Sequence, residues 1–203
     1  MTAQPSTAPT VVRVSRRVRR ARILVAPRRP VEVVVPPGTS DAAVERLLQR
    51  HGDWIARRTA ELESRPMLGL DAPGVAWLDG RPVPPPAGDR ERWYRGQARK
   101  RLTASVEREG ARLGLNGWRR IRIGDPRSRW GSCSARGTLS FSWRLVVAPA
   151  WVADYVVVHE LCHLRHMNHS PRFWAMVREA YPRHAEAQAW LRTHGPELLT
   201  LSP

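Results

Sequence analysis

The stretch that most constrains this chain is His159-Glu160-Leu161-Cys162-His163. On a helix, positions i and i+4 lie one above the other, so His159 and His163 can offer imidazole nitrogens to the same metal ion. Glu160 lies about 100° round the helix from His159, where it can accept a proton from a water on that ion. The stretch therefore requires a rigidly held helix and predicts a metal-dependent hydrolase.

The residues on either side favour a buried helix. Residues 149–158 begin with a proline suited to a first turn and continue with enough apolar side chains to bury most of the helix. Downstream, Ser170-Pro171 offers a new N-cap and first-turn proline, so we expect the histidine-rich helix to end near Met167-Asn168. His169 would then lie on a turn that can fold back toward the metal.

Three side chains compete to be the third protein ligand. Zinc in a catalytic site is typically held by three protein ligands, with a fourth position open to water. His169 is favoured because it follows His163 by six residues, a return seen in other zinc-hydrolase motifs. Glu179 could replace it in a site with two histidines and one glutamate, and Glu186 is a weaker alternative of the same kind.

His166 is set aside on distance. It lies about 10 Å further along the helix axis than His159, so the two cannot easily share one ion, and we expect it either at the rim of the site or in contact with a ligand from behind. The predicted Zn²⁺ ligands are His159, His163 and His169, and the predicted catalytic base is Glu160.

Several segments together resemble a known family. They are Ser128-Arg129-Trp130-Gly131-Ser132-Cys133, residues 145–149, residues 155–163, Asn168-His169-Ser170 and Phe173-Trp174. In them the chain resembles the YgjP-like zinc metallopeptidases, relatives of the SprT-like and WLM proteases, from about residue 11 to residue 195. The resemblance implies the same three histidine ligands, the same glutamate as general base and a zincin-like α+β fold. It departs from the family pattern over residues 75–86, which are short and proline-rich where an aromatic-Leu-Gly hairpin is usual.

Periodicity along the chain predicts an α+β protein in which a small mixed or antiparallel sheet packs on the metal-binding helix. The predicted parts are a disordered arm (1–10), a lobe with a β-hairpin and a helix (11–64), a Pro/Gly-rich linker (65–88) and a zincin-like catalytic domain (89–203). In the lobe, residues 11–26 and 31–35 read as two strands and residues 39–64 as a helix, with a break near Gly52-Asp53 left open.

The second half is predicted to begin with a long amphipathic helix. Asp89 can cap this helix, which runs to about Leu113 with apolar residues at helical spacing on one side. Strand patterns follow at residues 120–123, 129–134 and 138–143, and the last two pair across the turn 135–137.

The segment Arg129-Trp130-Gly131-Ser132 is a second functional candidate. Gly131 permits close backbone approach, and an exposed strand edge beside the metal could pair with an extended peptide; a packing role against the metal helix is an equal alternative. Tyr155, one turn before His159, and Arg129 are candidate donors to the oxyanion of a transition state. Helix packing is an alternative role for Tyr155.

Composition adds a second question, because the formal net charge is +16. Of the 34 basic residues all but Lys100 are arginine. This charge is either a solvated surface or an attraction for nucleic acid, nucleotides or acidic proteins. The predicted function is peptide-bond hydrolysis at zinc. The alternatives are a zinc-dependent nucleotide phosphoanhydride hydrolase and a nucleic-acid-associated protease or binding module.

Compartment and membrane association follow from apolar runs and cysteines. Residues 1–10 have no signal-peptide core, and the longest apolar stretch, around residues 145–153, is well below the roughly 18 residues that span a bilayer. Cys133 and Cys162 are too few for a four-thiolate zinc site and fit a reducing compartment. We expect a cytoplasmic protein without a membrane helix, with Cys162 as a small buried side chain facing away from the metal; the oligomeric state stays open.

Overall fold

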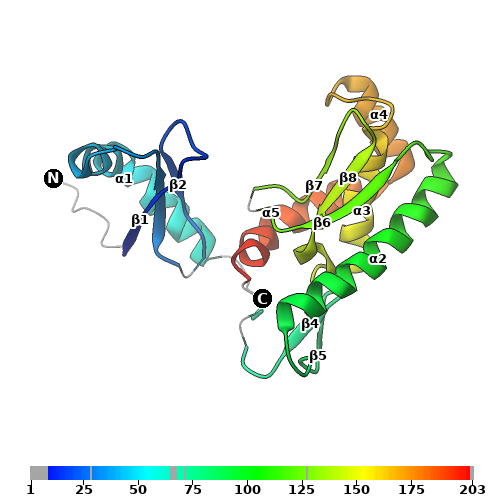
Figure 1. Cartoon of the computed structure of the whole chain (residues 1–203), viewed down its shortest axis with the longest axis horizontal. Coiled ribbons are helices and arrows are strands. Elements are labelled where there is room, and N and C mark those ends of the chain that lie inside the picture. Colours follow the sequence, from blue (N-terminus) through cyan, green and yellow to red (C-terminus); the bar gives the residue numbers. More distant parts are fainter. Residues whose placement is uncertain (1–8, 28, 65–67, 71, 127, 202–203) are drawn as a thin grey trace. The chain divides into compact units, whose positions relative to one another are not determined.

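Helices and small sheets follow one another irregularly along the chain, which makes this an α+β protein (Figure 1). The computed structural model describes residues 9–27, 29–64, 68–70, 72–126 and 128–201. It divides into two compact units, Met1–Pro66 and Met67–Pro203.

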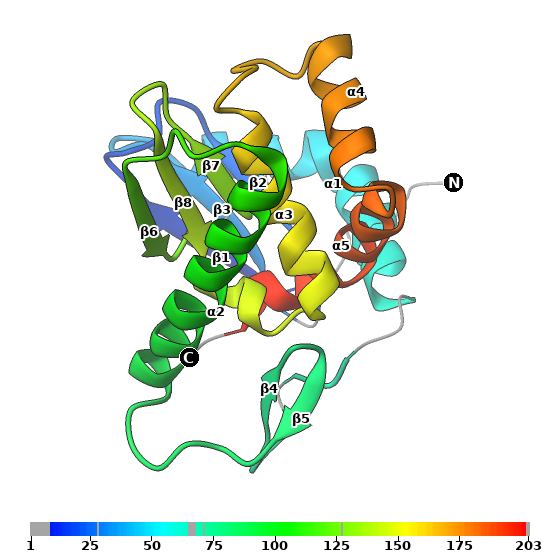
Figure 2. The same ribbon diagram turned by 90° about the vertical axis from the view of Figure 1, so that its right-hand side faces the viewer.

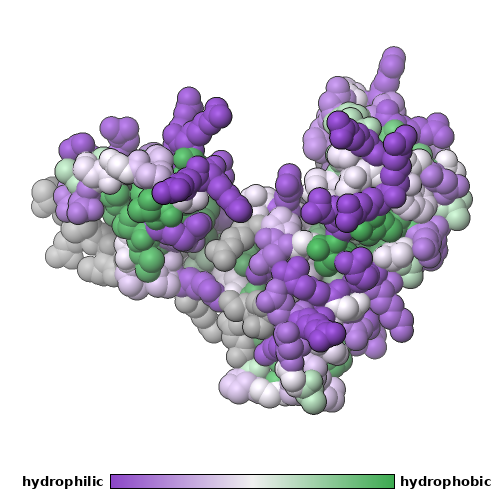
Figure 3. Space-filling model, in the orientation of Figure 1, coloured by the Kyte–Doolittle hydropathy of each residue, from purple (hydrophilic) through white to green (hydrophobic). Residues whose placement is uncertain are grey.

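The N-terminal unit packs a three-stranded sheet on one helix. Its elements are β1 (Thr10–Val14), β2 (Arg22–Leu24), β3 (Val31–Val35) and α1 (Asp41–Glu63), with strand order β1-β3-β2. Val33 and Val35 of the central strand pack with Val44 of α1 in a small core. The helix runs without a break at Gly52. Edge strand β1 is exposed along its whole length, and Figure 3 shows apolar side chains gathered over it.

Residues 11–26, predicted as one strand, instead form two. β1 pairs parallel with β3, β2 pairs antiparallel with β3, and a turn at Arg16-Arg17 follows β1. The prediction of one long strand is wrong because adjacent arginines at residues 16–17 and 19–20 break the alternation of apolar and polar residues. A strand through them would have no apolar face to bury.

The C-terminal unit contains the predicted site. Its elements are β4 (Ala76–Leu78), β5 (Arg81–Val83), α2 (Arg90–Leu113), β6 (Arg120–Gly124), β7 (Gly131–Cys133), β8 (Thr138–Ser142), the 3₁₀-helix η1 (Trp143–Val146), α3 (Ala150–Cys162), α4 (Pro171–Ala180) and α5 (His184–Thr200). Helix α3 lies centrally and contacts α2, α4, α5 and strand β7 (Figure 2). Most of its residues are buried, as its apolar sequence predicts.

The sheet beside α3 is small and mixed. Its strand order is β6-β8-β7, with β6 parallel and β7 antiparallel to β8. β7 is therefore an edge strand, and it is the strand of this sheet that packs most closely on α3.

Residues 65–88, predicted as a linker, differ from that expectation. In the described part, Leu70 and Ala76 are buried in the core of the C-terminal unit, and β4 and β5 form a hairpin. The N–H of Asp79 in the hairpin turn donates to the carbonyl of Val146 at 2.9 Å. Pro and Gly mark turns as well as linkers, so their abundance alone cannot separate the two. A hairpin thus forms where the sequence departs from the family pattern.

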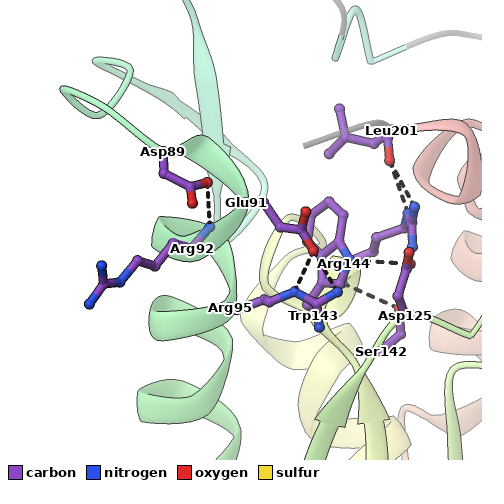
Figure 4. A network of polar contacts seen from close by, with 9 residues as sticks. All are labelled: Asp89, Glu91, Arg92, Arg95, Asp125, Ser142, Trp143, Arg144 and Leu201. Atoms are coloured by element: carbon purple, nitrogen blue, oxygen red, sulfur yellow. Dashed lines mark hydrogen bonds and ion pairs between the residues drawn. The ribbon is translucent and has the colours of Figure 1, made fainter.

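Helix α2 forms as predicted. The Asp89 side chain accepts a hydrogen bond from the Arg92 N–H at 3.0 Å (Figure 4), and Gly114 ends the helix in a left-handed conformation. Tyr94 and Leu102, four and twelve residues into the helix, are among the side chains of its buried face.

Helix α3 ends earlier than predicted, at Cys162 instead of near Met167-Asn168. His163 is its C-cap, and the next N–H groups tighten into i→i−3 bonds, from Leu164 to Leu161 and from Arg165 to Cys162. The capping serine and the proline at residues 170–171 indicate where α4 begins, so they do not predict where α3 ends.

A buried arginine joins three parts of the C-terminal unit (Figure 4). The guanidinium of Arg144, 5% exposed, pairs with Asp125, lies over the Trp143 ring and donates to the Leu201 carbonyl at 2.9 and 3.1 Å. Burial opposes ionisation of Asp125, but the hydrogen bond and charge of Arg144 outweigh it and hold the pKa of this carboxyl below its ordinary value. Leu201, the residue that follows α5, is thereby bonded to η1.

No helix within the described ranges is long and apolar enough to cross a membrane.

Candidate metal centre

Three imidazoles converge at the C-terminal end of α3. The Nε2 atom of His169 lies 3.1 Å from Nε2 of His159 and 3.2 Å from Nε2 of His163. Within the part of the chain that the structure describes, these three form the cluster of His, Cys, Asp or Glu side chains close enough to share an ion. Two ligands on a tetrahedral zinc, each about 2.0–2.1 Å away, are about 3.3 Å apart. The nitrogen spacing therefore fits one ion.

Two of the imidazoles, those of His159 and His163, are neutral near pH 7. Burial, aided by the two neighbouring imidazoles, lowers the pKa of His159 to about 4, and burial also lowers the pKa of His163. The Nδ1 atom of His163 lies 2.8 Å from the carbonyl oxygen of His166. Because a carbonyl can only accept, Nδ1 carries the proton and the Nε2 lone pair faces the cluster. The backbone carbonyl of His166 thus orients the imidazole of His163.

Phe173 supports the cluster from α4. Its ring is fully buried, stacks on His163 at 4.4 Å between centroids, and meets the edges of His159 and His169 at 4.9 Å. Helix α4 begins as predicted, with the Ser170 side chain accepting from the Phe173 N–H. The cap therefore fixes the ring that backs all three imidazoles.

The two competing carboxylates lie outside the cluster. Glu179 is exposed on α4, and Glu186 forms an ion pair with Arg183 at 2.9 Å. The structure groups His169 with the two helical histidines instead.

Glu160 is a buried carboxylate beside the cluster. Glu160 is only 5% exposed. Burial raises the pKa of its carboxyl to about 7, although the charge of Arg129 and a hydrogen bond from the Cys133 N–H both act to lower it. Its Oε2 atom is buried and has no hydrogen-bond partner among the described residues. A carboxyl in this state can take up and release a proton near neutral pH.

Strand β7 passes directly against this carboxylate at Gly131. A Cβ atom on Gly131 would lie 2.6 Å from both Cγ and Oε1 of Glu160. Glycine is the residue that permits this approach.

One edge of β7 is open. The Trp130 carbonyl and the Ser134 N–H bond to β8 at 2.8 and 3.0 Å, so the alternate residues Gly131 and Cys133 turn their backbone groups the other way. No other described strand pairs with that edge.

Two pockets meet at the cluster. The larger, about 420 Å³, is lined by Arg129, Trp130, Gly131, Tyr155, Val156, His159, Glu160, Gln188, Leu191 and Arg192. The smaller, about 250 Å³, is lined by Arg129, Gly131, Ser132, Cys133, His159, Glu160, His163, Met167 and His169. The predicted substrate-binding segment, residues 129–132, thus borders both pockets.

Tyr155 lies in the larger pocket. Its hydroxyl accepts a hydrogen bond from Gln188 Nε2 at 2.9 Å, and its ring meets the His159 ring edge-on at 6.0 Å between centroids. Burial raises the pKa of Tyr155, so its hydroxyl keeps its own proton.

Sequence reasoning missed the wall that α5 contributes. Gln188, Leu191 and Arg192 line the larger pocket, and Gly195 lies against Trp130, where a Cβ would be 3.0 Å from the ring. These four positions follow i, i+3, i+4, i+7 spacing, so they share one helix face. This spacing could have been recognised in the sequence as one face of a helix, but it does not indicate which part of the protein that face contacts.

Both cysteines are free, Cys162 being buried and Cys133 half-buried. Burial raises the pKa of each thiol to about 11. They stay protonated near neutral pH, a state in which a thiol is a poor metal ligand.

Imidazoles around one point, with a buried carboxylate beside them, are the arrangement used by metal-dependent hydrolases. The chain belongs to the YgjP-like family: the model of the YgjP-like metallopeptidase domain matches residues 19–83 and 88–194. This confirms the resemblance inferred from the motifs and defines the chain as a metallopeptidase in general terms, with peptides or proteins as its substrate class.

No curated protein matches the chain. Among solved structures, the metallopeptidase zymogen of Pyrococcus abyssi abylysin is similar with 24% identity and a TM-score of 0.42, over 45% of this chain and 92% of that one.

Proposed function

We propose that this chain is a zinc-dependent peptidase in which His159, His163 and His169 bind the ion and Glu160 is the general base. The supporting observation is the convergence of three imidazoles beside a buried carboxylate, with the Nε2 atom of His169 3.1 Å from that of His159 and 3.2 Å from that of His163. Three imidazoles are a donor set that zinc accepts in catalytic sites. On this proposal, α3, the sheet and α4 form a zincin-like arrangement.

The protein residues divide the chemistry among them. Zinc, when bound, supplies a Lewis acid that lowers the pKa of water and polarises the scissile carbonyl. Glu160 accepts the proton of the attacking water and passes it to the leaving amine. Its pKa of about 7 suits both transfers, because a base works best when its pKa is near the working pH.

The open edge of β7 is the proposed substrate track. The outward backbone groups of Gly131 and the outward carbonyl of Cys133 can pair with an extended peptide, which would then lie across the cluster; the Cys133 N–H is bonded to Glu160. Tyr155 is the proposed donor to the oxyanion, because Gln188 donates to its oxygen and leaves the hydroxyl proton for the substrate. Arg129, which lines both pockets, is the alternative donor.

Two substitutions test this function. Glu160→Gln should keep the metal and lose hydrolysis by about 10²- to 10⁴-fold, the usual contribution of a general base. His163→Ala should lose both metal and activity. Metal content by elemental analysis and cleavage of a panel of denatured proteins are the measurements. A Glu160→Gln protein that cleaves as fast as wild type would show that the base lies elsewhere.

The alternative substrates are tested in the same experiment. A panel of nucleoside triphosphates on metal-loaded protein should remain intact; nucleotide hydrolysis without any peptide cleavage would replace the peptidase proposal. Adding DNA to the protease assay tests the nucleic-acid-associated alternative, for which the rate should rise in a salt-dependent way.

A further inference from the structure

A third pocket lies where strand β7 ends. It has a volume of about 340 Å³ and is lined by Gly117, Arg119, Ser134, Ala135, Arg136, Gly137, Leu164 and Met167. Its charged side chains are Arg119 and Arg136, and no aspartate or glutamate of the described chain lines it. We call it the Arg119–Arg136 pocket.

The Arg119–Arg136 pocket adjoins the metal centre. Met167, 52% exposed, lines both this pocket and the 250 Å³ pocket around the histidines. Ser132 and Cys133 of β7 line the 250 Å³ pocket around the histidines, and the two residues that follow, Ser134 and Ala135, line the Arg119–Arg136 pocket. A peptide that follows the open edge of β7 past Cys133 would next meet Ser134, which lines the Arg119–Arg136 pocket.

Hydrogen bonds fix the backbone beneath the two arginines. The turn after β7 is closed by the Gly137 N–H, which donates to the Ser134 carbonyl at 2.9 Å, and Gly137 has a φ of 74°. The Gly137 carbonyl in turn accepts from the Arg119 N–H at 2.8 Å. Arg136 lies in that turn, so both exposed guanidinium groups extend from held backbone positions.

We propose that the Arg119–Arg136 pocket binds an acidic side chain of the peptide substrate, three or four residues to the N-terminal side of the scissile bond. This inference rests on the proposed peptidase function. Ser134 lies three residues beyond Gly131, about 10 Å along the extended strand, and Ala135 begins the turn that follows it. Antiparallel pairing, the more stable kind, makes this direction the N-terminal side of the substrate. Guanidinium groups bind carboxylates through charge-assisted hydrogen bonds.

The test uses paired peptides built around a mapped cleavage site, with Glu or Gln at the third and fourth residues before the cleaved bond. We expect the Glu peptides to have a kcat/KM about three- to tenfold higher, as for partly exposed charge pairs, and to lose the advantage in high salt. Arg136→Gln and Arg119→Gln should each reduce the preference, and Arg136→Glu should favour a Lys peptide. Arg99→Gln, an exposed arginine on α2, is the matched control and should change nothing.

A binding measurement separates this inference from the proposed function. Fluorescence anisotropy of the labelled peptides on the Glu160→Gln protein reports affinity without turnover, and it should show the same dependence on Arg119 and Arg136. If cleavage of these peptides persists in Glu160→Gln and His163→Ala, and so does not come from the metal centre, yet the Glu peptides bind better through these arginines, the proposed peptidase function fails and the acidic site stands. Equal cleavage and equal binding of Glu and Gln peptides, or a preference that survives both Arg→Gln changes, would overturn the inference.

Discussion

The contact between Gly131 and Glu160 gives the sharpest test of the metal centre. A Cβ atom added at residue 131 would lie 2.6 Å from the Glu160 Cγ, whereas carbon atoms in contact are normally about 3.5–4.0 Å apart. The three nearest atoms all belong to Glu160. Gly131→Ala must therefore move the carboxylate, or the strand, by about 1 Å.

A shift of that size has a known scale of effect. A misplacement of about 1 Å in an active site can cost on the order of 10²-fold in rate. We expect Gly131→Ala to lower kcat by about 10²-fold while the protein keeps one bound metal ion, because the imidazoles are not the atoms displaced. Steady-state cleavage of the best peptide gives kcat, and elemental analysis gives the metal content.

The control is Gly96→Ala. Gly96 lies within α2 and an added Cβ there meets nothing within 4 Å, so the change should leave kcat unaltered and favour the helix by about 0.5–1 kcal/mol. A Gly131→Ala protein with wild-type kcat would refute the reasoning, since β7 would then not constrain Glu160. Loss of the metal together with activity would show instead that the strand supports the histidines.

Three further outcomes are expected. Because Arg144 lowers the pKa of Asp125, the ionised carboxylate stabilises the folded protein at pH values above its ordinary pKa, and this stabilisation is lost as the pH falls. In urea unfolding, the wild type should therefore have a higher free energy of unfolding than Asp125→Asn at pH 6. The difference between the two proteins should disappear below about pH 4. Phe173→Leu should lower the free energy of unfolding by about 1–2 kcal/mol and weaken metal affinity in a competition titration, because the ring backs the imidazoles. Removing the metal with a chelator should lower the Tm of wild type and leave that of His163→Ala unchanged, since an ion bound only by the folded state stabilises it.

Local signals in the sequence predicted local structure well. Asp89 at the start of α2 and Ser170-Pro171 at the start of α4 both lie where their capping chemistry indicated. The spacing of His159 and His163 requires only helix geometry, and these two side chains do lie together with His169. Each of these inferences uses residues within about ten positions of one another.

Features that depend on distant residues were missed. The parallel pairing of β1 with β3 and the burial of Leu70 and Ala76 in the core have no local signature. The Leu68 N–H, for example, donates at 2.7 Å to Glu197, which lies 129 residues further on. The end of α3 was misplaced for another reason: the residues used to predict it, Ser170 and Pro171, mark the start of α4 and not the end of α3.

The backbone carbonyl of Leu201 accepts two hydrogen bonds from the buried guanidinium of Arg144, 57 residues earlier in the sequence. Proteolysis that removed Leu201 would leave the N–H groups of the Arg144 guanidinium buried without the carbonyl that accepts their hydrogen bonds. Leaving a buried donor unmet costs about 1–3 kcal/mol, and more for a charged group. Loss of Leu201 would therefore lower the stability of the folded core, although no residue of the metal centre had been removed.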